Sequence, residues 1–170
     1  MWDWLRDLIE RLAKAAADWV SRCIPQYNPA AWNDADGIQH NNNCYNYACD
    51  IPTGTFAQPG RATGNQYTSL DCTQVGSGAQ SDGLVSVDCS GGCGCRDCCH
   101  QIALVIWPGV DFHWYRRDRD GRWSHKPGGS EARNVDNSGN LITDPRTADR
   151  GGYTVFCGCY CVCKSKVTID

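Results

Sequence analysis

The sequence predicts an α+β fold, in which a short helix packs on a small antiparallel sheet and an extra amphipathic helix precedes both. Residues 2–23 repeat apolar side chains at helical spacing. Residues 101–162 instead contain a run of apolar residues, a dipeptide typical of hairpin turns and a segment in which apolar and polar residues alternate. These three patterns predict β-strands. A chain of 170 residues corresponds to one domain and can bury its own core. We therefore expect an N-terminal helix over residues 1–24 and a cysteine-rich domain over residues 25–170.

The N-terminal helix is expected to end before Pro25. Its apolar face consists of Trp2, Leu5, Leu8, Ile9, Leu12, Ala16, Trp19, Val20 and Cys23. The opposite face carries pairs with the favourable i,i+4 order: Asp7/Arg11, Glu10/Lys14 and Asp18/Arg22. Because this polar face is charge-balanced rather than basic, we interpret the helix as packed on the domain. A membrane-surface helix or a partner helix is the alternative, and self-association through it is permitted.

The β elements follow in the second half of the chain. The continuous apolar run from Gln101 to Trp107 predicts a central strand buried on both faces. Asp120-Gly121 is a strong signal for a hairpin with a two-residue turn. Further strands are expected at 84–88, 112–117, 122–126 and 153–162. A short helix is expected over residues 43–49, and the segment 54–83 is expected to be an irregular loop region.

Composition limits the classes of partner and the compartment. The net charge of −3 gives no basic surface for nucleic acid or an anionic membrane. No stretch reaches the roughly 18 apolar residues of a membrane span, and residues 1–23 show no apolar core of a secretory signal. The 13 cysteines nevertheless suit an oxidising environment. We expect a secreted or exported protein, with a cytoplasmic protein whose thiols bind metal as the alternative.

Cys44 is the candidate nucleophile. It follows three asparagines at the start of the short predicted helix, where free N–H groups and the helix dipole favour a thiolate. The odd number of 13 cysteines leaves one thiol over after complete pairing. If Cys44 is that thiol, the other twelve can close six disulfides. A disulfide role for Cys44 is the alternative.

Two histidines are candidate partners of this thiol. His113 begins a predicted strand and His125 follows it by twelve residues. A two-residue turn would place residue 116 opposite His125, which leaves His113 about 10 Å out of register. A longer loop or a bulge would bring the two histidines closer. Asp111, Asn134 and Asp136 are alternatives to His125 as the third member of a catalytic triad. His40 is the alternative to His113 as base.

Three segments together resemble the papain-like cysteine hydrolases, and most of all the NlpC/P60-type peptidases. They are Asn43-Cys44-Tyr45-Asn46-Tyr47-Ala48, Asp111-Phe112-His113-Trp114-Tyr115 and Trp123-Ser124-His125-Lys126-Pro127. The resemblance covers roughly residues 40–162, and it departs from the family at Tyr45-Asn46, where a small residue and Trp or Ser are usual.

The resemblance implies a papain-like fold, with the nucleophile helix on an antiparallel sheet. It also implies a cysteine peptidase or amidase that cleaves an amide bond of a peptide or peptidoglycan-like substrate. The Cys44 thiolate would attack, His113 would act as base, and His125 would orient His113. No cofactor and no metal are expected for this chemistry.

The remaining cysteines gather in two clusters, five within residues 89–99 and four at alternate positions from Cys157 to Cys163. On a strand, all four sulfur atoms of the second cluster would face the same side. We interpret the clusters as disulfides that join the 89–99 loop to the C-terminal strand, with a metal site as the alternative.

Two further hypotheses lack catalysis. One is a cysteine-rich metal-binding or disulfide-stapled structural module. The other is a binding domain in which Trp114 and Trp123 hold a ligand.

Overall fold

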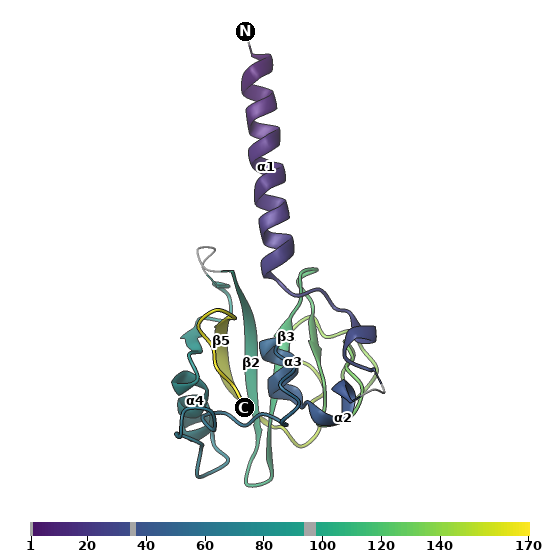
Figure 1. Ribbon diagram of the computed structural model, residues 1–170. Helices are drawn as coiled ribbons and strands as arrows, with labels where there is room; N and C mark the ends of the chain where they lie inside the picture. The colour runs from purple at the N-terminus through teal and green to yellow at the C-terminus, as the bar shows by residue number, and fades with distance from the viewer. Residues whose placement is uncertain (1, 35–36, 94–97) are drawn as a thin grey trace.

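The computed structural model describes residues 2–34, 37–93 and 98–170, and only the backbone of residues 19–22. Within these residues the architecture is α+β, with one open antiparallel sheet of five strands (Figure 1). The helices are α1 (Asp3–Cys23), the 3-10 turn η1 (Pro29–Ala31), α2 (Ile38–Asn41), α3 (Cys44–Cys49) and α4 (Cys72–Ser81). The strands are β1 (Val85–Val87), β2 (Cys99–Trp107), β3 (Asp111–Arg117), β4 (Trp123–His125) and β5 (Val155–Cys163). The predicted fold class is thus confirmed at the level of an α+β protein with a small antiparallel sheet.

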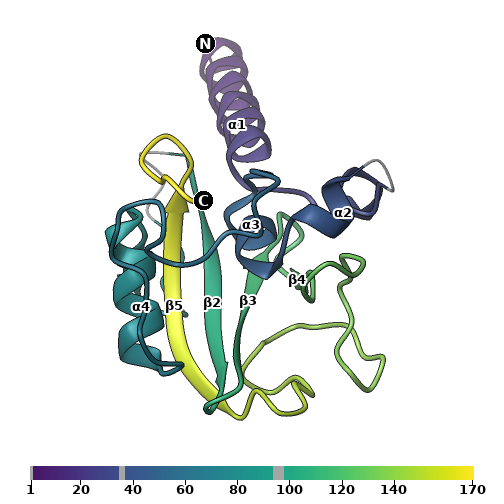
Figure 2. The same cartoon turned by 60° about the horizontal axis from the view of Figure 1, so that its bottom comes forward.

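The sheet has the order β1-β5-β2-β3-β4, and every neighbouring pair is antiparallel. β2 is the central strand, and it is buried on both faces as predicted. Leu104 and its even-numbered neighbours pack in a cluster with α3 and α4, which Figure 2 shows beside the sheet. Val105 and its odd-numbered neighbours pack on the other face against the loops that follow β4. Helices α3 and α4 therefore pack on one face of the sheet, and the loops after β4 pack on the other.

The segment 54–83 is not wholly irregular, since α4 lies within it. Asp71 caps this helix, because its carboxylate accepts the backbone N–H of Gln74 at 2.9 Å. A Cβ atom at Gly76 would lie 2.5 Å from the Tyr160 hydroxyl, so the helix can approach β5 closely only with glycine there. The glycines and serines that allow this approach have low helix propensity, and they conceal the helix in the sequence.

β3 and β4 form the predicted hairpin, but the predicted two-residue turn is wrong. Tyr115, rather than residue 116, lies opposite His125, so the loop spans residues 118–122. His113 is then two residues from the partner of His125, on the same face of the sheet. Diagonal neighbours of this kind lie close enough for long side chains to meet.

Helix α1 is confirmed, but the interpretation that it packs on the domain is wrong. Figure 1 shows it projecting from the domain, and Trp2 and Leu12 are 78% and 62% exposed. Both faces of the sheet are already covered by other segments, so none is left for α1. Its C-terminal end is held by the disulfide Cys23–Cys98. The domain boundary between residues 24 and 25 stays a prediction.

Candidate functional site

Helix α3 begins at Cys44 because Asn43 caps it. The Asn43 side chain accepts the backbone N–H groups of Tyr45 and Asn46 at 3.0 and 3.2 Å. The Asn46 side chain accepts the Asn43 N–H in return at 3.1 Å, which completes a reciprocal cap. Asn43 and Asn46 thus fix where the helix starts and place the thiol in its first turn.

The structure brings Cys44, His113 and His125 into one region. Cys44 and His113 line a cavity of about 110 Å³, together with Asp111 and Tyr153. The His113 Nε2 and His125 Nδ1 atoms lie 2.8 Å apart, so one ring donates a hydrogen bond to the other. The hairpin register of β3 and β4 accounts for this contact.

Burial determines the charge of these three groups. Loss of hydration raises the pKa of the Cys44 thiol to about 12. Burial likewise lowers the pKa of His113 well below its usual value and that of His125 to about 4. At neutral pH the cluster therefore holds a thiol and two neutral imidazoles. This state differs from the Cys44 thiolate that the sequence predicts, because burial outweighs the favourable position at the helix start.

The alternative partners of Cys44 have other contacts. The Asp111 carboxylate accepts the Tyr153 hydroxyl at 2.7 Å. The Asp136 carboxylate accepts backbone N–H groups within its own loop, including that of Asn140 at 2.9 Å. Asn134 accepts a backbone N–H through its own carbonyl, and His40 is exposed on α2. Of these four residues, Asp111 alone lines the cavity with Cys44 and His113. Which of them would serve as a third catalytic member stays a prediction.

Residues that the sequence analysis missed hold His125 in place. Its Nε2 atom lies 3.1 Å from the Val135 carbonyl oxygen and 3.2 Å from the Arg133 Nε atom. The adjacent Lys126 is fully buried, and its ammonium group donates to the Asn42 carbonyl at 2.6 Å. Loss of hydration lowers the pKa of Lys126 to about 8. A lysine in a predicted hairpin strand normally indicates an exposed position, so no sequence pattern points to this contact.

Arg116 is the centre of a second buried network that joins α3 to the hairpin. Its guanidinium group donates to Asp118 at 2.9 Å and to Asp50 at 3.2 Å. It also donates to the Tyr47 hydroxyl at 3.0 Å and lies 4.1 Å from the centre of the Tyr47 ring. Arginine forms such multiple contacts because its donors are arranged in a rigid plane. The network fixes the distance between α3 and β3.

Disulfides hold the other end of the sheet. The predicted link between the 89–99 loop and the C-terminal strand is confirmed by Cys89–Cys159, Cys93–Cys161 and Cys99–Cys163. Two more bridges, Cys72–Cys157 and Cys23–Cys98, attach α4 and α1. The metal interpretation is wrong for these ten cysteines, and no group of three metal-ligating side chains occurs in the described residues. Cys95 lies outside those residues.

The cysteines of β5 do not all face one side, contrary to the prediction. The register with β2 shifts between Leu104 and Val105, where β5 has an extra residue at Cys157. Cys157 consequently packs in the α4 cluster, whereas Cys159 packs on the opposite face. The bulge thus lets a single strand form disulfides on both sides of the sheet.

The predicted count of six disulfides around one free thiol is also wrong. Cys44 and Cys49 are both free and buried in α3. The two thiols lie at opposite ends of α3, about one and a half helical turns apart. None of the five disulfides involves this helix.

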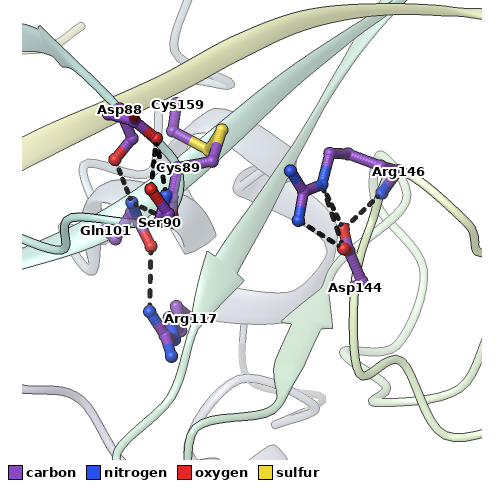
Figure 3. Close-up of a disulfide and its surroundings, with 8 residues drawn as sticks. All are labelled: Asp88, Cys89, Ser90, Gln101, Arg117, Asp144, Arg146 and Cys159. Atoms are coloured by element: carbon purple, nitrogen blue, oxygen red, sulfur yellow. Dashed lines mark hydrogen bonds and ion pairs between the residues drawn. A yellow bond between two sulfur atoms is a disulfide. The ribbon is translucent and has the colours of Figure 1, made fainter.

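Hydrogen bonds surround the Cys89–Cys159 bridge (Figure 3). The Gln101 side-chain amide donates to the Cys89 carbonyl at 3.1 Å and accepts from Arg117 at 3.2 Å. The turn after β1 is thereby connected across β2 to β3. Nearby, Arg146 binds Asp144 through several short contacts (Figure 3). The bridge therefore lies in a region that polar contacts also order.

A comparison with known proteins identifies the family. The chain is 51% identical over 137 residues to insoluble matrix shell protein 1 of Ruditapes philippinarum. The match covers 80% of this chain and 88% of that protein. The chain belongs to the family of this shell matrix protein. No protein-family model and no solved structure matches the chain.

Membership of this family corrects the functional prediction. The resemblance to papain-like and NlpC/P60-type peptidases is wrong, since the relative is named for a shell matrix and no peptidase family matches. The predicted cysteine peptidase with its peptide or peptidoglycan-like substrate is therefore wrong as well. The burial of Cys44 agrees with this correction, because the raised pKa of its thiol leaves little of the nucleophilic thiolate at neutral pH.

The alternative of a disulfide-linked structural module agrees better with the family and with the five bridges. The hypothesis that Trp114 and Trp123 hold a ligand finds no support, since both rings are buried. Among the described residues, no helix is long and apolar enough to cross a membrane.

Proposed function

We propose that the chain is an extracellular structural component of an insoluble matrix. In this proposal residues 25–170 form a rigid, cross-linked module, and residues 1–24 form a separate attachment helix. The single observation that supports it most is the set of five disulfides in a member of a shell matrix family. Disulfides persist in extracellular and other oxidising environments, and most are reduced in the cytosol.

The Cys44–His113–His125 cluster has a structural role in this proposal. The hydrogen bond between the two rings satisfies polar atoms that would otherwise be buried without partners. The neutral state of all three groups lowers the cost of burying them. The cluster joins the start of α3 to the hairpin, at the end of the sheet that carries no cysteine.

Fractionation of the producing tissue tests this function. An antibody against the recombinant full chain is applied to sections and to material extracted in turn with salt, a chelator and guanidinium chloride. We expect label outside the cells, with the protein retained in the residue after salt and chelator. Peptide mapping without reduction should recover the five disulfide pairs from the extracted protein.

A soluble pool inside the cells, with the ten bridged cysteines present as free thiols, would contradict the proposal. The proposal would also be contradicted if the antibody bound no insoluble extracellular material in the tissue. Both results are independent of how the purified chain behaves in solution.

A further inference from the structure

Helix α1 carries an apolar seam that the domain leaves uncovered. Trp2, Leu5, Ile9, Leu12 and Ala16 follow one another at alternating spacings of three and four residues. This is the a/d pattern of a coiled coil, in which each apolar side chain inserts between four residues of a facing helix. Ile9 and Leu12 are 58% and 62% exposed, although they occupy the centre of this seam. A regular seam of this kind indicates a helical partner rather than an irregular surface.

The charges of α1 argue against a membrane as that partner. Asp7 and Arg11 pair with each other at 3.0 Å along the polar face, and Asp3 pairs with Arg6 at 3.8 Å. Helices that bind anionic membrane surfaces carry an excess of Lys and Arg on their polar face, which α1 lacks. The polar face carries four acidic and four basic residues and so has no excess positive charge, which leaves the apolar seam as the face available to a second helix.

We propose that α1 pairs with α1 of a second copy of this chain, in antiparallel orientation. A second copy presents the same apolar seam, so it supplies a matching surface without any other molecule. The pair would form a two-domain particle, with one domain at each end of a short coiled coil.

The position of the domain decides the orientation. Paired helices lie about 8 to 10 Å apart. A domain of this size has a radius of gyration of roughly 15 Å, and α1 rises from it rather than from a separate linker (Figure 1). Two domains at the same end of a parallel pair would therefore overlap. In the antiparallel pair, the 21 residues of α1 separate the domains by about 30 Å.

The attachment of α1 also suits this arrangement. Its C-terminal end is held by the disulfide Cys23–Cys98, and the carbonyl of Ile24 accepts a hydrogen bond from Arg119 at 3.3 Å. The direction of the helix relative to the domain is consequently fixed at its base. The inference concerns the purified chain and does not depend on the proposed matrix function.

Sedimentation equilibrium of the oxidised full chain tests the proposal over about 1 to 200 μM, because a seam of about two heptads suits a weak dimer. We expect the mass of the wild type to rise toward twice the monomer mass. Ile9→Ser/Leu12→Ser should weaken the association at least tenfold. Asp7→Ser/Arg11→Ser is the matched control, since it places the same residue type on the polar face with no change in net charge. It should associate like the wild type.

Small-angle X-ray scattering at the highest concentration tests the orientation. We expect two lobes separated by the length of the helix, whereas a compact dimer would overturn the antiparallel arrangement. A wild type that stays monomeric at every concentration would overturn the pairing itself. Binding of the monomeric chain to phosphatidylcholine vesicles, lost in Ile9→Ser/Leu12→Ser, would assign the seam to a membrane and overturn it as well.

Discussion

The two ends of the sheet are held together by different chemistry. At one end, disulfides join β5 to β2 and to the 89–99 loop that follows β1. β3 and β4 carry no cysteine, and they are held by the buried contacts of Arg116, His113 and His125. A disulfide acts mainly by restricting the unfolded chain, whereas a buried polar network acts only in the native state and depends on its charges. We call the end formed by β1, β5 and β2 the disulfide end, and the end formed by β3 and β4 the hairpin end. The stability of the disulfide end should therefore respond to reductant, and that of the hairpin end to pH and to single substitutions.

Loss of Arg116 should have the largest effect. Arg116→Met removes the partner of the buried Asp118 carboxylate and should lower the free energy of unfolding by about 3 to 5 kcal/mol. Guanidinium denaturation of the oxidised protein, followed by tryptophan fluorescence, measures this loss. Arg122→Met is the control, because Arg122 pairs with Asp120 at the surface, at 3.6 Å. It should cost no more than about 0.5 kcal/mol. Equal losses for the two variants would show that the Arg116 network does not stabilise the hairpin end.

Removal of one bridge should have the next largest effect. Cys89→Ala/Cys159→Ala opens a loop between cysteines 70 positions apart and should cost about 2 to 4 kcal/mol. Cys44→Ala is the control, since it removes a buried thiol that forms no bridge, and should cost about 1 kcal/mol. The same denaturation experiment without reductant gives both values. If the two variants lose the same stability, the bridge contributes nothing beyond the packing of its sulfur atoms.

Acid should weaken the hairpin end through His125. Its pKa of about 4 in the folded protein lies below the usual value of about 6.5, so the unfolded chain binds a proton first as the pH falls. The stability contributed by neutral His125 is complete above about pH 6.5 and is lost as the pH falls toward 4, by about 3 kcal/mol. His125→Gln lacks this titration. The difference in unfolding free energy between the wild type and this variant should shrink by that amount between pH 7 and pH 4. A constant difference across this range would contradict the prediction.

The smallest effect on the folded protein is expected from a reagent that alkylates thiols. Burial raises the pKa of both Cys44 and Cys49, so iodoacetamide at pH 7.5 should leave both unlabelled for as long as the protein stays folded. Mass spectrometry after unfolding in guanidinium should then show both labelled within minutes. Rapid labelling of Cys44 alone in the folded protein would contradict the neutral state assigned to the cluster.

Sequence patterns predicted the disulfide end better than the hairpin end. Alternate cysteines from 157 to 163 indicate a bridged strand directly, because strand geometry fixes where the sulfur atoms lie. The exception is Cys157, since the bulge depends on pairing with β2. The proximity of His113 and His125 was foreseen only in part, because a loop of five residues replaces the expected turn.

The charges of the candidate site could not be predicted from sequence. The thiolate expected at the start of α3 follows from local helix geometry, but the tertiary packing around Cys44 determines its pKa. Arg116 and Lys126 are charged residue types that sequence patterns place at the surface. Both are buried by contacts between segments far apart in the chain. The exposure of α1 was likewise missed, because its amphipathic pattern suits any apolar partner.

The disulfide connections have one consequence for the fate of the chain after proteolysis. The bridge Cys23–Cys98 spans the first half of the chain, and the bridges that end in β5 span the rest through Cys163. A single cut of the backbone anywhere between Cys23 and Cys163 therefore leaves its two pieces covalently joined. A protease would have to cut more than once within this range to release a fragment, so a copy that is cut once keeps both of its pieces.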